Sequence, residues 1–140
     1  SVGSVLEPAG LDKSVGIIST FYLRDPTDPQ WQKTKEYQDW SAWMDKYYPA
    51  GDKKDPFNVF GYSVTQTLVH VLKQCGDNLT RENVMKQAAS IKGLELPMLL
   101  PGIKVNTGPD DYYPIEQEQL AKFNGKSWEL FGEILGNRGS

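Results

Sequence analysis

Residue types that could carry out chemistry are scarce in this chain. It contains a single histidine, His70, and a single cysteine, Cys75, so neither a multi-histidine metal site nor a cysteine zinc cluster can form. A Ser-His-Asp site would need that same histidine, and no nucleophile-elbow pattern is present. Glycine-rich phosphate-binding loops are also missing from the sequence. We therefore predict no catalytic residues, no metal ligands and no cofactor, and expect a protein that is not an enzyme.

The best acidic pair is Asp110 and Asp111, which could supply a general acid and a general base to a small hydrolase. The pair lies in TGPDDYYP, where glycine and proline predict a solvated turn. A hydrolase is therefore the less favoured alternative. His70 lies within an apolar stretch and is interpreted as structural, and Cys75 is interpreted as a small buried hydrophobe.

Aromatic residues are the positive feature. Between Asp55 and Lys73 the chain carries no charged residue, and this stretch begins with Phe57, Phe60 and Tyr62. These rings cluster near the start of a predicted helix, where backbone N–H groups and the helix dipole favour anionic ligand groups. The rings themselves add apolar surface. Two interpretations stay open: a core cluster that anchors the helix, or one wall of a ligand pocket.

The composition narrows the class of protein further. The chain has 140 residues, about one domain, and 39% of them are hydrophobic. No apolar run approaches the roughly 18 residues that a membrane span needs. The net charge of −3 and the scattered basic residues argue against nucleic acid as a partner. No signal peptide is visible, and the chain starts at Ser1 without a methionine.

Helices and short strands must position these residues. The β-branched and aromatic run 15–23 predicts a strand buried on both faces of an α/β sheet. Helical spacing of apolar residues predicts helices at 34–48, 57–75 and 80–91. The tryptophans and tyrosines in and beside the first helix are expected to be core and helix-packing residues: Trp31, Trp40, Trp43, Tyr47 and Tyr48.

The helix 57–75 carries clear boundary signals. Asp55 resembles an N-cap followed by proline at the first position, although Asn58 could cap instead, and Gly76 suits a left-handed C-terminal position. One face is expected to be core, with these residues: Phe60, Val64, Leu68, Val71, Leu72 and Cys75.

The C-terminal part reads as strands. IKVN, at 103–106, predicts a short strand, and IEQEQLAKFNGKSWELF predicts a β-hairpin. Asn124-Gly125 is a strong signal for a two-residue type I′ turn, which would place Ala121 opposite Trp128. The predicted class is α/β, with too few strands to close a standard sheet alone.

Three segments together resemble the C-terminal part of the periplasmic solute-binding proteins of branched-chain amino-acid-type ABC importers. They are GIISTFYLRDPTDPQW, FGYSVTQTLVHVLKQCGDNLTRENVMKQAASI and LPMLLPGIKVNTGPDDYYPIEQEQLAKFNGKSWELF. The likeness runs through nearly the whole chain in the same order. Family members are much longer, so residues 1–140 look like a single C-terminal segment with an incomplete site.

The resemblance implies part of a type I periplasmic-binding fold, with two lobes that close over a solute. Residues 15–23 would be the last strand of lobe two and lead into the hinge. Residues 31–110 would supply helices and a strand of lobe one, and 111–140 the return crossing and hairpin. Phe60, or failing it Phe57, matches the aromatic that often contacts the ligand's side chain in this family.

The resemblance also implies the function and partners. The protein would capture an amino acid or a related small organic acid or amide, aromatic acids included, and deliver it to ABC permease subunits. It would be periplasmic, or extracellular and membrane-anchored, in a bacterium. A ligand-sensing regulator of the same fold is an alternative. Because the segment lacks its sheet partners, it is expected to expose apolar helix faces and to self-associate.

Overall fold

The computed structural model describes residues 2–136, and this part of the chain mixes helices with one antiparallel sheet. A π-helical turn and a short helix come first, and the three longest helices precede the hairpin. In chain order the elements are η1 (Val2–Leu6), α1 (Glu7–Ala9), β1 (Ile18–Phe21), α2 (Pro29–Gln32), α3 (Lys35–Tyr47), α4 (Pro56–Cys75), α5 (Arg81–Ala88), β2 (Gln117–Phe123) and β3 (Trp128–Gly136). The predicted mixture of helix and strand is confirmed at this coarse level.

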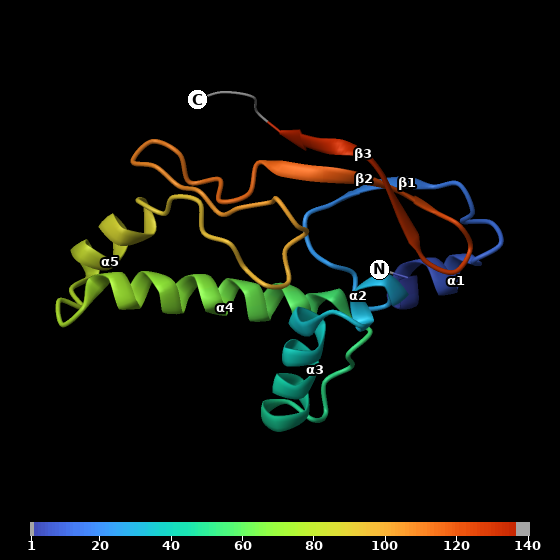
Figure 1. The fold of residues 1–140 in the computed structure, drawn as a ribbon, viewed down its shortest axis with the longest axis horizontal. Helices are drawn as coiled ribbons and strands as arrows, with labels where there is room; N and C mark the ends of the chain where they lie inside the picture. The colour runs from blue at the N-terminus through green and yellow to red at the C-terminus, as the bar shows by residue number, and fades with distance from the viewer. Residues whose placement is uncertain (1, 137–140) are drawn as a thin grey trace.

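The elements are arranged along one long axis (Figure 1). The 20-residue α4 runs beneath the long connection that follows α5, α3 projects from one end of α4, and the sheet lies on the side of that connection away from α4. No helix between residues 2 and 136 is both long enough and apolar enough to cross a bilayer.

The sheet has three strands in the order β1-β2-β3, and both pairings are antiparallel. Its central strand β2 and the first residue of β3 pack against η1, and the small core between them contains these residues: Val2, Leu6, Ala121, Phe123 and Trp128. The prediction of a strand buried on both faces at 15–23 is wrong. Only Ile18–Phe21 is a strand, it lies at the sheet edge, and Ile18 is 57% exposed. An edge strand has a neighbouring strand on one side only, and three of the four residues of β1 are exposed.

The predicted hairpin is confirmed, but its predicted turn is wrong. Phe123 pairs with Trp128 and Ala121 with Leu130, so the loop has four residues rather than two. A type I′ turn needs positive φ at both central residues, and only Gly125 has it here, at 99°. The Asn124 side chain explains the longer loop, because its Oδ1 accepts hydrogen bonds from the backbone N–H groups of residues 126 and 127, both at 2.9 Å.

The helix boundaries follow their capping residues. Asp55 caps α4, since its carboxylate accepts from the Phe57 N–H at 2.9 Å. Asn58 instead donates its side-chain amide to the Asp52 carbonyl at 2.8 Å. Helix α3 begins after Thr34, as predicted. Helix α5 begins after Thr80, whose hydroxyl accepts from the Asn83 N–H at 3.3 Å, and it ends at Ala88, earlier than the predicted residue 91.

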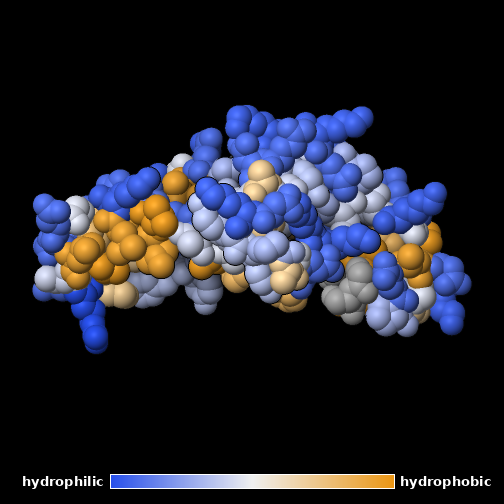
Figure 2. Space-filling model, turned by 90° about the horizontal axis from the view of Figure 1, so that it is seen from below, coloured by the Kyte–Doolittle hydropathy of each residue, from blue (hydrophilic) through white to orange (hydrophobic). Residues whose placement is uncertain are grey.

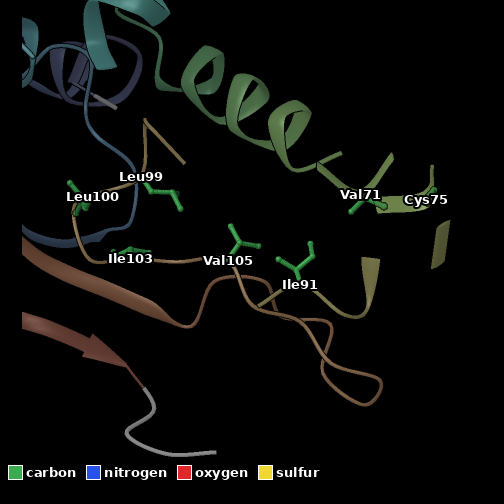
Figure 3. Close-up of a cluster of buried hydrophobic side chains, with 7 residues drawn as sticks. All are labelled: Val71, Cys75, Ile91, Leu99, Leu100, Ile103 and Val105. Carbon is green, nitrogen blue, oxygen red and sulfur yellow. The ribbon is translucent and has the colours of Figure 1, made fainter. Parts of the chain in front are cut away.

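The largest core cluster joins the C-terminal half of α4 to the connection between α5 and β2 (Figure 3). Its buried side chains are Val71, Cys75, Ile91, Leu99, Leu100, Ile103 and Val105. The predicted strand 103–106 is reduced to a single antiparallel bridge, in which Leu94 and Val105 exchange both backbone hydrogen bonds. The buried Cys75 agrees with its interpretation as a small hydrophobe.

The face of α4 that was predicted to be core is mostly open, which corrects that expectation. Val71 and Cys75 are buried, but four other members are 40 to 51% exposed: Phe60, Val64, Leu68 and Leu72. The buried stripe of the helix is rotated and includes Val59 and Ser63. Seen from below, hydrophobic side chains gather at the end of the molecule where α4 meets α5 (Figure 2).

The aromatic residues of α3 are only partly core. Trp40 is fully buried beside Met44 and Val59 in a third core cluster. Tyr47 and Tyr48 are more than half exposed, so their prediction as packing residues is wrong. Tyr47 is the last residue of α3 and Tyr48 follows it, and the Tyr47 ring contacts the edge of this cluster through Trp43, at 5.7 Å between ring centroids.

A candidate ligand-binding groove

An open cavity of about 580 Å³ lies between α4, α5 and the connection that leads from Ile91 to β2. It falls within the range of roughly 300–1,000 Å³ that small-molecule sites occupy. Its walls are mainly aliphatic, as expected of such sites. We call this cavity the α4 groove.

One wall of the α4 groove is the open face of α4. Phe60, Val64 and Leu68 follow one another at intervals of four residues, so their side chains lie in a row along the helix. The Phe60 ring is 45% exposed and lies on the second turn of α4, near its capped N-terminus. The groove therefore presents one aromatic ring and a row of branched aliphatic side chains.

The opposite walls come from α5 and from the connection that follows it. Val84 and Met85 line the groove from α5, and Ile115 and Tyr112 line it from the connection. Thr107 holds these two walls together, because its hydroxyl donates to the Ala88 carbonyl at 2.6 Å and accepts from the Ile91 N–H at 2.9 Å.

Few polar groups line the groove. Glu118, at the start of β2, is the single charged lining residue that the structure describes. Tyr22 lies beside it, and burial, followed by the negative charge of Glu118, raises the pKa of the Tyr22 hydroxyl. Ser63 is buried, and its hydroxyl has no hydrogen-bond partner among residues 2–136.

The three predicted site residues do not meet at one wall. Phe60 lines the α4 groove, while Tyr62 turns away from it and meets Trp43 edge-on, with 5.1 Å between the ring centroids. Phe57 is 73% exposed and lines neither of the two larger cavities. Residues 57, 60 and 62 point in three directions because each residue of an α-helix turns the side chain by about 100°. Whether any of them binds a ligand stays a prediction.

Tyr62 belongs to a second, more polar cavity of about 420 Å³ between α3 and α4. His70, Gln66 and Lys73 also line it. Burial, followed by the charge of Asp39, raises the pKa of Tyr62. His70 is half-buried on the flank of α4, which agrees with its structural interpretation.

Asp110 and Asp111 form a turn, as predicted. Asp110 is exposed, and the Asp111 carboxylate accepts a hydrogen bond from the Tyr113 N–H at 3.0 Å. The Asp111 backbone closes the turn through two hydrogen bonds with Gly108. Across residues 2–136, no three His, Cys, Asp or Glu side chains come together in a way that could hold a metal ion.

Sequence reasoning did not find most of the groove. The sequence pattern assigns Val64 and Leu68 to the core, and at Val84 and Met85 it predicts a helix without a site. Their helical spacing was a usable signal, since α4 and α5 both carry an apolar stripe. Glu118 lies in the alternating pattern of a strand, and no local signal marks it.

Comparison with known proteins gives no match for this chain among family models, curated proteins or solved structures. Membership of the solute-binding family therefore stays a prediction.

Proposed function

We propose that this chain is the C-terminal part of a solute-binding component of an ABC importer. It would capture an amino acid or a related small organic acid or amide for delivery to permease subunits, in the periplasm or at the outer surface of a bacterium. In this proposal the α4 groove contributes part of the solute site. The proposal rests on the sequence resemblance together with the position of one side chain.

The observation that carries the proposal is the Phe60 ring. It lies near the N-terminus of α4 and lines an apolar groove of ligand-binding size while keeping 45% of its surface exposed. A ring that served only to anchor the helix would be expected to lie buried in the core, as Trp40 does. An exposed ring beside aliphatic side chains can instead contact the apolar part of a solute.

The proposed two-lobe arrangement assigns the elements as follows. The strand at 15–23 and the hairpin within 111–140 belong to lobe two, and 31–110 belongs to lobe one. The pairing of β1 with β2 supports the first part of this assignment, because it joins these distant segments in one sheet. Exposed apolar residues of α4 that do not line the groove, Val69 and Leu72, support the second part, because a lobe-one helix would use such residues to cover a sheet.

A thermal-shift screen tests the function. Amino acids, small amides and aromatic acids are added to the protein, and a ligand that binds the folded state raises the Tm by an amount that grows with the logarithm of its concentration above Kd. We expect at least one of these solutes to raise the Tm and none to be turned over. Hydrolysis that the Asp111→Ala substitution abolishes would contradict the transport proposal.

Phe60→Ala locates the site. Because the ring is half-exposed, we expect its removal to cost about 1–2 kcal/mol of unfolding free energy, less than the roughly 3–5 kcal/mol of a buried phenylalanine. Solute binding, measured by calorimetry, should weaken about tenfold or more, since an aromatic contact and its apolar area are lost.

Val59→Ala is the matched control for this substitution. Val59 is the preceding residue, fully buried on a face of α4 that does not line the groove. Its truncation should cost about 2 kcal/mol of stability and leave solute affinity unchanged. If Phe60→Ala and Val59→Ala affect binding and stability in the same proportion, Phe60 is a packing residue and the site lies elsewhere.

A further inference from the structure

The charges around the α4 groove are one-sided. Glu118 lines the groove, and no Lys, Arg or His lies among the lining residues that the structure describes. Glu118 also forms no ion pair within residues 2–136. A carboxylate beside an apolar surface attracts a cation more strongly than a carboxylate that is surrounded by water. The reason is that the effective dielectric constant is lower beside the apolar surface.

Two lysines of the connection after α5 already have other partners. Lys92 follows Ile91 in the groove wall, but its ammonium donates to the Thr107 carbonyl at 3.1 Å and Lys92 is not a lining residue. Lys104 pairs with Glu95 at 2.7 Å. The negative charge of Glu118 is therefore not offset by either lysine.

The polar group beside Glu118 adds no positive charge to the groove. Tyr22 is the adjacent lining residue, and its hydroxyl stays protonated at neutral pH because burial and the Glu118 charge both raise its pKa. A neutral phenol can accept or donate a hydrogen bond but cannot pair with a carboxylate as a cation does. Among the lining residues that the structure describes, a ligand carboxylate placed here would meet one negative charge and no positive charge.

We propose that the α4 groove selects apolar amines, such as the amide of an aromatic or branched amino acid, over the corresponding acids. The ligand's ammonium pairs with the Glu118 carboxylate beside Tyr22, and its hydrocarbon part lies against Phe60, Val64 and Leu68. This inference rests on the proposed function in one respect, that the groove is a solute site. The inference narrows the proposed solutes to those that carry a net positive charge.

Three probes with the same phenyl group test the inference: phenylalaninamide, phenylalanine and phenylpropanoate. They carry a positive charge, both charges, and a negative charge respectively. Calorimetry at neutral pH should rank them in that order, with about a tenfold step in Kd between the amide and phenylalanine. Glu118→Gln should remove most of the preference for the amide while leaving the affinity for phenylpropanoate equal or better.

Glu116→Gln is the matched control, because Glu116 is exposed two residues away and does not line the groove. It should leave the ranking unchanged. If phenylalanine or phenylpropanoate binds as tightly as the amide and Phe60→Ala weakens them, the charge inference is wrong and the proposed function stands. If the amide binds but Phe60→Ala has no effect, its site is not the groove. Absence of binding by all three overturns the inference.

Discussion

At the residue scale, Arg24 connects several segments of the structure, and no pattern in the sequence predicts this role. Its side chain is nearly buried, and Nε donates to the Leu99 carbonyl at 3.1 Å. The guanidinium also lies over the Trp31 ring at 4.8 Å and reaches the Glu36 carboxylate at 3.4 Å. One side chain thus links the segment after β1, helix α2, helix α3 and the connection that lines the groove.

Replacing Arg24 with methionine should lower the free energy of unfolding by about 2–4 kcal/mol, because the buried Leu99 carbonyl loses its charged donor and the stacking on Trp31 is lost. Urea denaturation measures this change. Lys35→Met serves as the control, since Lys35 forms an exposed ion pair with Asp39 and its removal should change stability little. A loss no larger than that of the control would mean that Arg24 is not a structural link.

At the element scale, the wall of the groove depends on a connection with little regular structure. Between α5 and β2 the chain forms only isolated bridges, such as the one between Leu94 and Val105. Adjacent to this bridge, Lys104 and Glu95 form an exposed ion pair at 2.7 Å. A hydrogen bond from Lys104, followed by its charge, lowers the pKa of Glu95.

This ion pair predicts a pH effect of known sign. The folded-state pKa of Glu95 lies below the unfolded value, so the stabilisation is present above the unfolded pKa and disappears as the pH falls through the folded pKa. At neutral pH, Glu95→Gln should unfold at a slightly lower urea concentration than the parent, and in acid the two midpoints should coincide. Glu116→Gln, which removes a carboxylate outside this pair, should show no such convergence. If the difference in urea midpoint between Glu95→Gln and the parent grew in acid, the stabilisation by the Glu95–Lys104 ion pair would be contradicted.

The helices and the hairpin show where local signals suffice. Thr34, Asp55 and Thr80 mark the starts of α3, α4 and α5, because a capping side chain satisfies N–H groups only two or three residues away. The predicted hairpin register is wrong because of another local interaction. The Asn124 side chain binds the backbone of the turn and replaces the expected two-residue geometry with a longer loop.

At the scale of the whole molecule, the main feature is apolar surface left uncovered. α4 buries one stripe against the connection and leaves Val64, Leu68 and Leu72 substantially exposed. A face of this kind is typical of a surface that binds a ligand or packs against further polypeptide. Such a surface should also drive association between copies of the chain.

We expect the chain to self-associate at micromolar concentration, and Leu68→Glu to shift it toward the monomer in sedimentation equilibrium. Leu68 is 51% exposed, so the new carboxylate can stay hydrated and the fold should persist, which circular dichroism checks. Gln74→Glu introduces the same charge at an exposed position of α4 that does not line the groove, and should leave association unchanged. A parent protein that is already monomeric would refute this expectation.

The amino-acid sequence alone determined which segments become the three longest helices and the hairpin, because caps, turn residues and helical spacing act over a few neighbouring positions. It also restricted the available chemistry, since one histidine and one cysteine exclude whole classes of site. Only the tertiary structure decided which face of α4 is buried. Helical spacing identifies an apolar stripe, but whether Phe60 and Leu68 meet a core or solvent depends on which distant segment packs there. The connection between α5 and β2 packs against Val71 and Cys75, and it leaves Phe60, Val64 and Leu68 open to line the groove.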